Sequence, residues 1–382
     1  MKQHLRLVLI MISIVLLFGK AVAAESGDLL GSLKAQGQIW SSPKLDGDLV
    51  YFGSDDGNIY AYYRNSKTLK WRYTTGGKVR SSAAFSTNAV FFSSDDGLLY
   101  ALDKRSGKLK WKFNLNDKDA NRILPADHAP WIFDYTKSSP VVDGDVLYIG
   151  SSDHHLYTLS TSTGELKWRF RAGERIRATA TFNDTLIFIS SWDGSTYALN
   201  KQSGKLVWEH ASQARIVSSP VRIGDNIIIG SRDTRIYALN AQQGHVVWHY
   251  KFSNGSWVES SAAKGENDNV FYIGSSDNKQ LMKFDVNTGK PLWTFNTKGW
   301  AWGTPTYSNG LVYLGATGAD SHWTTVQRGF FAVDAATGKE RWNYPPKSID
   351  DYVHGGVFGR VAVNDGEVFV PDLDGHVYVF KM

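Results

Sequence analysis

The sequence predicts an all-β fold, an eight-bladed β-propeller whose four-stranded blades dock through tryptophans. The first observation behind this prediction is a repeated stretch, clearest in SSDDGLLYALDKRSGKLKW, which ends at Trp111. The second is the spacing, because the terminal tryptophans of the copies follow one another at steps of 40, 57, 40, 40, 45 and 49 residues. These tryptophans are Trp71, Trp111, Trp168, Trp208, Trp248, Trp293 and Trp342. A period of this size marks a repeat architecture in which neighbouring units bury a common core.

Each copy carries four strand signals separated by turn residues, which is the third observation. In the first copy the signals are IWSSPKL (39–45), DLVYFGS (48–54), NIYAY (58–62) and LKWRY (69–73). The pair Asp56-Gly57 between the second and third signals predicts a hairpin, because glycine adopts positive φ without strain. A second corner, such as Thr163-Gly164, precedes the fourth strand.

The ends of the chain are expected to meet in one blade. Counting first-to-third strands gives eight copies, and the last copy, residues 357–380, has no fourth strand. Aligning residues 37–39 with residues 77–79 puts residues 30–36 at a fourth-strand position, with Gly31 in place of tryptophan. We therefore expect the N-terminal strand to complete the C-terminal blade, which closes the ring and leaves only short, protected edges. Each ladder tryptophan is expected to fill the gap between its own blade and the next.

Residues 1–23 have the composition of a secretory signal peptide. They contain a basic start with Lys2 and Arg6, an apolar run from Leu7 to Phe18, and the small residues Ala21-Val22-Ala23 at a cleavage site. The apolar run is shorter than the roughly 20 residues that span a bilayer. Residues 24–382 are then expected to form one propeller domain that is periplasmic or secreted, with no transmembrane segment.

Charge and cysteine content exclude several classes of function. Removal of the signal deletes Lys2, Arg6 and Lys20, so the formal net charge falls from +5 to +2, which does not indicate a nucleic-acid partner. The chain has no cysteine. This excludes disulfides, thiolate metal sites, cysteine nucleophiles and a lipid anchor on cysteine.

The repeated pattern Ala-x-Asp/Asn-x-x-x-Gly-x-x-x-Trp, as in the segment from Ala101 to Trp111, resembles the tryptophan-docking repeat of the pyrroloquinoline-quinone (PQQ)-like propellers. The resemblance covers nearly all of residues 30–380. It implies either a PQQ-dependent alcohol or sugar dehydrogenase or a non-enzymatic propeller similar to the BamB-like outer-membrane assembly factors. Size, eight-copy layout and Ser-Ser-Pro segments, as at residues 41–43, favour the BamB-like branch. The long quinoprotein dehydrogenases carry adjacent cysteines and BamB-like proteins are lipidated, and this chain departs from both patterns.

Alternating residues in the expected first strands define a candidate binding site. One set is small or apolar and is expected to pack between blades: Ile39, Val79, Thr136, Ile176, Ile216, Val258, Ala301 and Val357. Their neighbours are expected to surround the mouth of the central channel: Trp40, Lys78, Arg80, Lys137, Arg175, Arg177, Arg215, Trp257, Glu259, Trp300 and Trp302. Basic and aromatic side chains together suit a planar or elongated anion. A hydrated polar rim closed by bulky side chains is the alternative interpretation.

Insertions into the repeat are expected to enlarge the same end of the channel. They comprise residues 114–135 and 343–356, between blades, and residues 316–329, between second and third strands. Both loop types emerge on one face of a propeller, and long loops on a rigid scaffold are where binding residues concentrate. The partner-binding candidates in these loops are Trp131, Phe133, His322, Trp323, Tyr352 and His354.

Catalytic and metal-binding signals are weak. Asp153-His154-His155 replaces an Asp-Gly turn, but adjacent histidines in a hairpin point to opposite sides and no third ligand is identifiable. The sequence contains no Gly-x-Ser-x-Gly, His-Glu-x-x-His or phosphate-loop motif. We therefore expect no metal site, no cofactor and no catalytic residue.

Three functions follow from these observations. The leading hypothesis is a non-catalytic periplasmic scaffold that binds another envelope protein. The resemblance implies that this scaffold takes part in outer-membrane protein assembly. The first alternative is a compact PQQ-dependent sugar or alcohol dehydrogenase with a divalent cation. The carboxylates of PQQ would be bound by basic residues, namely Arg80, Lys137, Arg177 and Arg215. Trp40 or Trp302 would stack on the PQQ ring, and Glu259 would lie near the cation. The second alternative is a propeller that binds an anionic polysaccharide or small molecule with the same residues.

Overall fold

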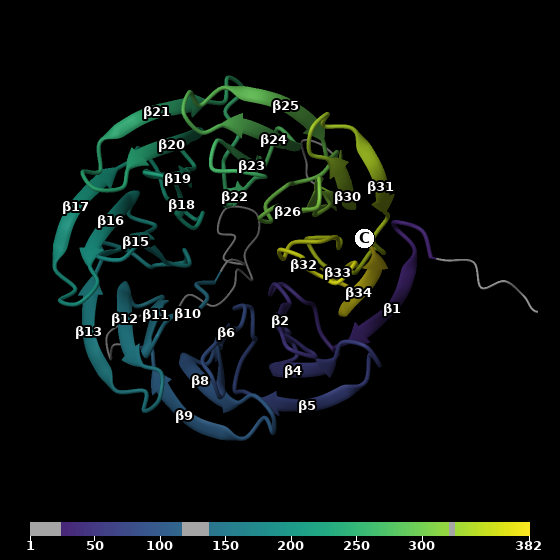
Figure 1. The fold of residues 1–382 in the computed structure, drawn as a ribbon, viewed down its shortest axis with the longest axis horizontal. Helices are drawn as coiled ribbons and strands as arrows, with labels where there is room; N and C mark the ends of the chain where they lie inside the picture. The colour runs from purple at the N-terminus through teal and green to yellow at the C-terminus, as the bar shows by residue number, and fades with distance from the viewer. Residues whose placement is uncertain (1–23, 117–136, 321–324) are drawn as a thin grey trace, which may run out of the picture.

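The protein folds into a ring of sheets. The computed structural model describes residues 24–116, 137–320 and 325–382. These residues form eight four-stranded antiparallel sheets around a central axis (Figure 1), which confirms the predicted eight-bladed β-propeller. The inner strands lie beside the axis and the fourth strands form the rim (Figure 1). The predicted signal peptide lies outside the described residues. Within those residues, no helix has the length and apolar character needed to cross a membrane.

The first four blades follow the chain from inner to outer strand. Blade 1 contains β2 (Lys44–Asp46), β3 (Leu49–Gly53), β4 (Asn58–Tyr63) and β5 (Leu69–Thr74). Blade 2 contains β6 (Ala84–Phe85), β7 (Ala89–Ser93), β8 (Leu98–Asp103) and β9 (Leu109–Asn114). Blade 3 contains β10 (Val141–Asp143), β11 (Val146–Gly150), β12 (His155–Ser160) and β13 (Leu166–Arg171). Blade 4 contains β14 (Thr181–Phe182), β15 (Leu186–Ser190), β16 (Ser195–Asn200) and β17 (Leu206–Ala211).

The next three blades repeat this order, and blade 8 joins the two ends of the chain. Blade 5 contains β18 (Val221–Ile223), β19 (Asn226–Gly230), β20 (Arg235–Asn240) and β21 (Val246–Lys251). Blade 6 contains β22 (Ala263–Lys264), β23 (Val270–Gly274), β24 (Gln280–Asp285) and β25 (Pro291–Asn296). Blade 7 contains β26 (Thr306–Ser308), β27 (Leu311–Ala316), β30 (Gly329–Asp334) and β31 (Glu340–Tyr344), with the short ribbon β28 (Ala319–Asp320) and β29 (Thr325–Val326) inserted. Blade 8 contains β32 (Ala362–Asn364), β33 (Glu367–Pro371), β34 (His376–Lys381) and β1 (Leu29–Lys34).

The inner strands are shorter than the sequence predicted. The expected first strand at residues 39–45 is a strand only from Lys44, because the residues before it bond to side-chain hydroxyls instead of a strand ladder. The small and apolar set nevertheless packs between blades as expected. Ile39 lies in the core shared by blades 8 and 1. Val79, Ile176, Ile216, Val258, Ala301 and Val357 occupy the same place at the following seams, and Thr136 lies outside the described residues.

The predicted closure by the N-terminal strand is confirmed. Strand β1 pairs antiparallel with β34, with Ser32 opposite Tyr378 and Leu33 opposite Val377. The N–H of Gly27 donates to the carbonyl of Lys381 at 2.9 Å, so the ends of the described chain lie side by side.

The ladder tryptophans dock onto the next blade, as predicted. Trp208 shows the arrangement: its indole N–H donates to the carbonyl of Ala241 at 3.0 Å, and its ring covers Gly244. A Cβ at Gly244 would lie 2.5 Å from the indole, so this corner requires glycine for its positive φ of 74° and for space. The other docked pairs are Trp71–Gly107, Trp111–Gly164, Trp168–Gly204, Trp248–Gly289, Trp293–Gly338 and Trp342–Gly27.

The seam between blades 8 and 1 is built differently. Gly31 stands at the tryptophan position, and Lys67 with φ of 58° stands where the other corners have glycine. Two ion pairs cross the seam instead, Lys67–Glu367 and Arg64–Asp365, each at 2.8 Å. At this seam, ion pairs therefore take the place of the tryptophan packing found at the other seams.

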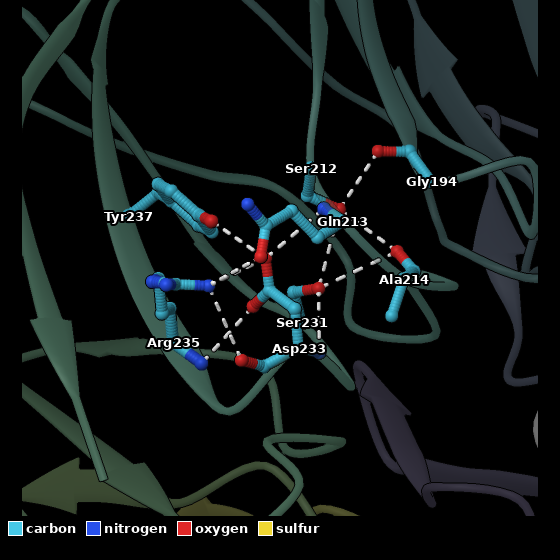
Figure 2. A network of polar contacts seen from close by, with 8 residues as sticks. All are labelled: Gly194, Ser212, Gln213, Ala214, Ser231, Asp233, Arg235 and Tyr237. Atoms are coloured by element: carbon cyan, nitrogen blue, oxygen red, sulfur yellow. Dashed lines mark hydrogen bonds and ion pairs between the residues drawn. The ribbon is translucent and has the colours of Figure 1, made fainter.

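In blades 1, 2, 4 and 5, an aspartate in the turn after the second strand bonds both to its own blade and to the connection from the preceding blade. Asp233 accepts the O–H of Tyr237 at 2.6 Å and the backbone N–H of Gln213, from the preceding connection, at 3.1 Å (Figure 2). We call this arrangement the Asp–Tyr clasp. The O–H contact recurs in the pairs Asp56–Tyr60, Asp96–Tyr100, Asp153–Tyr157, Asp193–Tyr197 and Asp374–Tyr378.

Candidate functional site

The inner strands and the residues before them surround a central channel with a cavity of about 520 Å³. Its wall has three tiers spaced two residues apart, represented in blade 1 by Trp40, Ser42 and Lys44. The upper tier contributes Trp40, Arg80, Lys137, Val217, Glu259, Trp302 and Phe358 to the lining. Five predicted mouth residues therefore line the cavity. The other six, Lys78, Arg175, Arg177, Arg215, Trp257 and Trp300, are not part of the lining.

The middle tier is a belt of hydroxyls that the sequence prediction missed. It consists of Ser42, Ser82, Ser139, Thr179, Ser219, Ser261 and Thr304, with Arg360 at the eighth position. The backbone N–H of one blade donates to the hydroxyl of the next, as from Ser42 to Ser82 at 2.9 Å and from Ser219 to Ser261 at 2.8 Å. The belt satisfies buried backbone groups that no strand ladder reaches.

The residue before each belt position explains the Ser-Ser pairs. The hydroxyl of Ser218 donates to the carbonyl of Gly230 at 2.7 Å and accepts its N–H at 2.9 Å, so it joins the inner segment to the second strand of its own blade. Ser41 binds Gly53 in the same way. The first serine of each pair thus bonds within its own blade, and the second, at the belt position, bonds to the neighbouring blade. Comparison of the copies at these positions was the signal that could have revealed the belt.

Arg80 of the upper tier is held by an acidic turn. Its Nε donates to Asp55 Oδ1 at 2.8 Å and its Nη2 to Asp55 Oδ2 at 2.5 Å. The guanidinium also lies 5.2 Å from the ring centre of Trp40, and its side chain is only 3% exposed. Lys78, which is exposed, lies 3.5 Å from the same carboxylate. This geometry is a buried ion pair with cation–π support.

The other charged residues of the upper tier also have partners. Lys137 lies 3.7 Å from Asp95. Glu259 accepts hydrogen bonds from Arg232, with the closer contact, to Nη2, at 2.5 Å. Burial raises the pKa of Glu259, and the Arg232 guanidinium opposes that shift. The expected cation ligand is therefore one half of an internal ion pair.

Arginines and tryptophans form a second cluster above blades 4 to 6. The guanidinium carbons of Arg175, Arg215 and Arg232 lie 4.8, 5.1 and 5.8 Å from the ring centre of Trp192. Arg232 also lies 4.6 Å from the ring of Trp257. Sequence reasoning missed Trp192 and Arg232 because both lie in turns, where the other copies carry residues such as Asp55. We call this group the Arg–Trp cluster.

Two loop types share one end of the propeller, as the sequence predicted. The N–H of Trp192, in a turn between second and third strands, donates to the carbonyl of Arg175, in the connection from the preceding blade, at 3.0 Å. Arg232 bonds to the carbonyl of Arg215 in the same way at 3.1 Å. We call this end the decorated face.

Described parts of two insertions interlock on the decorated face. Thr317 pairs with both Trp300 and Gly356, and the N–H of His354 donates to the carbonyl of Gly318 at 2.8 Å. An apolar cluster fills the space beneath them: Trp40, Trp300, Trp302, Ala319, Val326, Val353 and Leu373, with Tyr352 against it. The rings of Trp300 and Trp302 stack with their centres 4.5 Å apart. These loops form a packed cap.

The structure brings only some of the loop candidates together. Tyr352 and His354 both lie in the cap. Trp131, Phe133, His322 and Trp323 lie outside the described residues.

The Asp153-His154-His155 turn is a local structural feature in the described chain. His154 takes φ of 74°, the conformation that glycine has in other copies, and His155 is buried with Nδ1 3.1 Å from the carbonyl of Asp153. Tyr157 donates to Asp153 in an Asp–Tyr clasp. Among the described residues no three histidine or acidic side chains are placed to bind a metal.

The upper tier fits PQQ poorly as the structure holds it. Arg80 and Lys137 already face carboxylates, and Glu259 is bound by Arg232. Trp40 and Trp302 are 2% and 7% exposed and belong to the cap core, so a planar ring has little indole surface to stack on.

Comparison with solved structures shows where this fold recurs. BamB from Moraxella catarrhalis matches with a TM-score of 0.71 and 14% identity, over 93% of this chain and 100% of that chain. A europium-containing methanol dehydrogenase matches with a TM-score of 0.70 and 15% identity, over 90% and 84% of the two chains. Sqt1 from Saccharomyces cerevisiae matches with a TM-score of 0.69 and 13% identity, over 94% and 100%. At these identities the matches establish the fold alone.

Sequence comparison gives the family. A search of curated proteins finds no match. The family model described as outer membrane protein assembly factor BamB matches three overlapping segments, residues 20–131, 126–263 and 256–382. Together these segments run from residue 20 to the last residue, so the chain belongs to the PQQ-like β-propeller family that this BamB model describes.

Proposed function

We propose that the protein is a non-catalytic periplasmic scaffold that binds another envelope protein during outer-membrane protein assembly. The proposal rests on membership of the family described by BamB and on the match to a BamB structure along that structure's whole length. The periplasmic location rests on the signal-like composition of residues 1–23.

The observation that carries the proposal is the cap on the decorated face. The insertions extend one end of the ring, and apolar packing and backbone pairing hold their described parts in place. A preorganised surface loses little conformational entropy when it binds a partner. The exposed Arg215 of the Arg–Trp cluster lies on the same face and offers a cation that the indole of Trp192 positions.

Site-specific photo-cross-linking in the periplasm tests this assignment. A photoreactive residue at position 215 reports on the decorated face, and one at position 205, in the β16–β17 turn of blade 4, reports on the opposite face. We expect an envelope protein to cross-link from position 215 and not from position 205. Equal capture from both positions, or capture of no envelope protein, contradicts the proposal.

A charge reversal supplies the matched control. Arg215→Glu is expected to reduce capture of the partner by at least tenfold, whereas Lys205→Glu, an identical charge change at an exposed site on the other face, leaves capture unchanged. Equal melting temperatures of the two variants show that the loss is not a folding defect.

The structural match to a methanol dehydrogenase keeps the enzyme alternative open to a direct test. Calorimetric titration with PQQ and Ca²⁺, followed by a dye-reduction assay with alcohols and sugars, distinguishes the two functions. Saturable PQQ binding with dye reduction favours the dehydrogenase. Binding of an anionic polysaccharide is tested on a glycan array, where loss of signal in Arg215→Glu assigns it to the Arg–Trp cluster.

A further inference from the structure

Blade 8 breaks the hydroxyl belt with a cation. Seven blades place serine or threonine at the belt position, and blade 8 places Arg360 there. Two residues after the belt, blade 1 carries Lys44, where the corresponding residues are small or uncharged: Ala84, Val141, Thr181, Val221, Ala263, Thr306 and Ala362. The two exceptional residues belong to adjacent blades.

Hydrogen bonds fix Arg360 beside blade 1. Its backbone N–H donates to the hydroxyl of Ser42 at 2.9 Å, and its Nε donates to the hydroxyl of Thr306 at 3.2 Å. Arg360 and Lys44 both line the central channel and also a second cavity of about 370 Å³ between the inner strands of blades 7, 8 and 1. Arg360 is exposed and Lys44 is half-buried, and both line these two cavities beside the axis of the ring.

Within the described ranges of the chain, neither cation forms an ion pair with an acidic side chain. Elsewhere in the channel lining, Arg80 is paired with Asp55, Lys137 faces Asp95, and the one carboxylate of the described lining, Glu259, is bound by Arg232. No carboxylate of the described residues lies within ion-pair distance of Lys44. Desolvation of its ammonium group and the neighbouring Arg360 lower the pKa of Lys44 to about 8.

An anion resolves this arrangement. Two like charges side by side in the channel repel each other, and a bound oxyanion offsets this repulsion. With Nε on Thr306, the two Nη groups of Arg360 remain to bind two oxygen atoms, and the ammonium of Lys44 binds a third.

We propose that Lys44 and Arg360 form a binding site in the central channel for the carboxylate or phosphate group of a small molecule. Along the inner segments, Lys44 lies four residues beyond the upper tier and Arg360 two residues beyond it, and the site uses none of the residues that the scaffold proposal uses.

Binding measurements at constant ionic strength test the proposal. Inorganic phosphate, sulfate and citrate are titrated into the full chain by calorimetry, and each is also tested for its effect on the melting temperature. We expect at least one of them to bind and to raise the melting temperature of the wild type. The proposal is overturned if none of the three anions shows binding heat and none changes the melting temperature.

Variants separate this site from general anion binding. Lys44→Met and Arg360→Gln are expected to weaken binding of the active anion at least tenfold, and Lys110→Met, at an exposed position on the rim, leaves it unchanged. Lys44→Met is also expected to melt at a higher temperature than the wild type without anion, because it removes a half-buried cation that Arg360 repels. If Lys44→Met and Arg360→Gln both bind the anion as tightly as the wild type, the assignment is wrong.

The ionisation of Lys44 provides an independent readout. After reductive ¹³C-methylation, the Lys44 signal, assigned by its loss in Lys44→Met, is expected to titrate near pH 8 and to move upward by at least one unit when the active anion is added. The charged residues that line the same channel are Arg360, Arg80, Lys137 and Glu259, and Arg360 is the one that lowers the pKa of Lys44. An unchanged titration on saturation with the anion contradicts the proposal. A larger upward shift with phosphate than with citrate identifies phosphate as the source of the group, and the reverse identifies carboxylate.

Discussion

At the scale of single residues, seven of the eight blade seams depend on a glycine under an indole. Gly244 in blade 5 has φ of 74°, and a Cβ there would lie 2.5 Å from Trp208. Gly224 in the same blade has φ of 57° but open space around its Cβ position. An alanine at either position would strain the backbone in the same way. Only at Gly244 would its Cβ also collide with the indole ring.

This pair gives the first prediction. Gly224→Ala is expected to lower the free energy of unfolding by about 1–2 kcal/mol through left-handed strain. Gly244→Ala is expected to lose about 1–3 kcal/mol more, because the indole must also move. Urea unfolding of both variants measures the difference, and equal losses would show that the indole is not held against this corner.

Buried charge at the channel mouth gives the second prediction. Arg80→Gln leaves Asp55 in an enclosed site with only the exposed Lys78 nearby, so we expect a loss of about 3–5 kcal/mol in the free energy of unfolding. The control is Arg341→Gln, which breaks the Arg341–Asp334 pair; its arginine is 61% exposed, so the expected cost is below about 1 kcal/mol. Chemical denaturation decides between a structural Arg80 and a replaceable one.

At the scale of the element, the Asp–Tyr clasp makes stability depend on pH. Burial and the hydrogen bond to Asp193 raise the pKa of Tyr197 above its ordinary value, and Tyr60, Tyr100, Tyr157, Tyr237 and Tyr378 shift in the same direction. Above about pH 10 an unfolded tyrosine releases its proton and a clasped one keeps it. The folded state then binds more protons than the unfolded state, so stability falls as pH rises.

The third prediction follows from this sign. The free energy of unfolding is expected to fall between pH 10 and pH 11 by up to about 1.4 kcal/mol for each clasped tyrosine. Tyr197→Phe is expected to reduce the slope and also to cost about 1–3 kcal/mol at neutral pH, because Asp193 loses a donor. Tyr63→Phe, on an exposed side chain outside the clasps, should leave the slope unchanged.

Sequence reasoning reached the strands and turns of a blade more easily than their contacts. Asp-Gly and Thr-Gly pairs identified the corners because glycine's φ preference is local, and even His154, Thr234 and Lys279 take the same positive φ where glycine is missing. The clasp was not predictable, because it joins a turn to the connection of another blade. The inner strands were overestimated because hydroxyl bonds at residues such as Ser42 replace the ladder.

At the scale of the whole molecule, closure of the ring depends on strand β1. This strand covers the edge of β34, and Gly27 before it provides the surface on which Trp342 docks. The fourth prediction is that deletion of residues 24–34 from the folded domain abolishes the cooperative thermal transition, because the edge of β34 and the ring of Trp342 lose their cover. Circular dichroism and dye binding measure this loss.

A circular permutant is the matched control. A short linker from residue 382 to residue 24, with new ends at Gly224, keeps every strand pairing and breaks a turn with open space around it. We expect it to melt cooperatively within about 10 °C of the parent. If the truncated chain melts as cooperatively as the permutant, β1 is dispensable.

The candidate site shows where prediction from one sequence stops. The positions of Trp40, Arg80 and Glu259 in the channel wall followed from the repeat, because equivalent residues occupy equivalent places. Their partners did not follow, because Asp55 and Arg232 come from turns whose approach depends on how one blade lies against the next. Arg360 is an exception in the hydroxyl belt and Lys44 an exception two residues after it, so both could be recognised only once the structure had shown the tiers of the channel wall.

Blade 8 combines the earliest and latest strands of the described chain. Seven blades can form while the chain is being synthesised, but the ring cannot close until the last strand of blade 8 has been made. A nascent or truncated molecule is therefore an open ring with one unpaired strand edge. We expect such an edge to pair with a strand from another copy of the chain. The last blade interface to form is held by two ion pairs, Lys67–Glu367 and Arg64–Asp365. Salt screens such pairs, so high salt should slow the final step of folding more than it destabilises the closed ring.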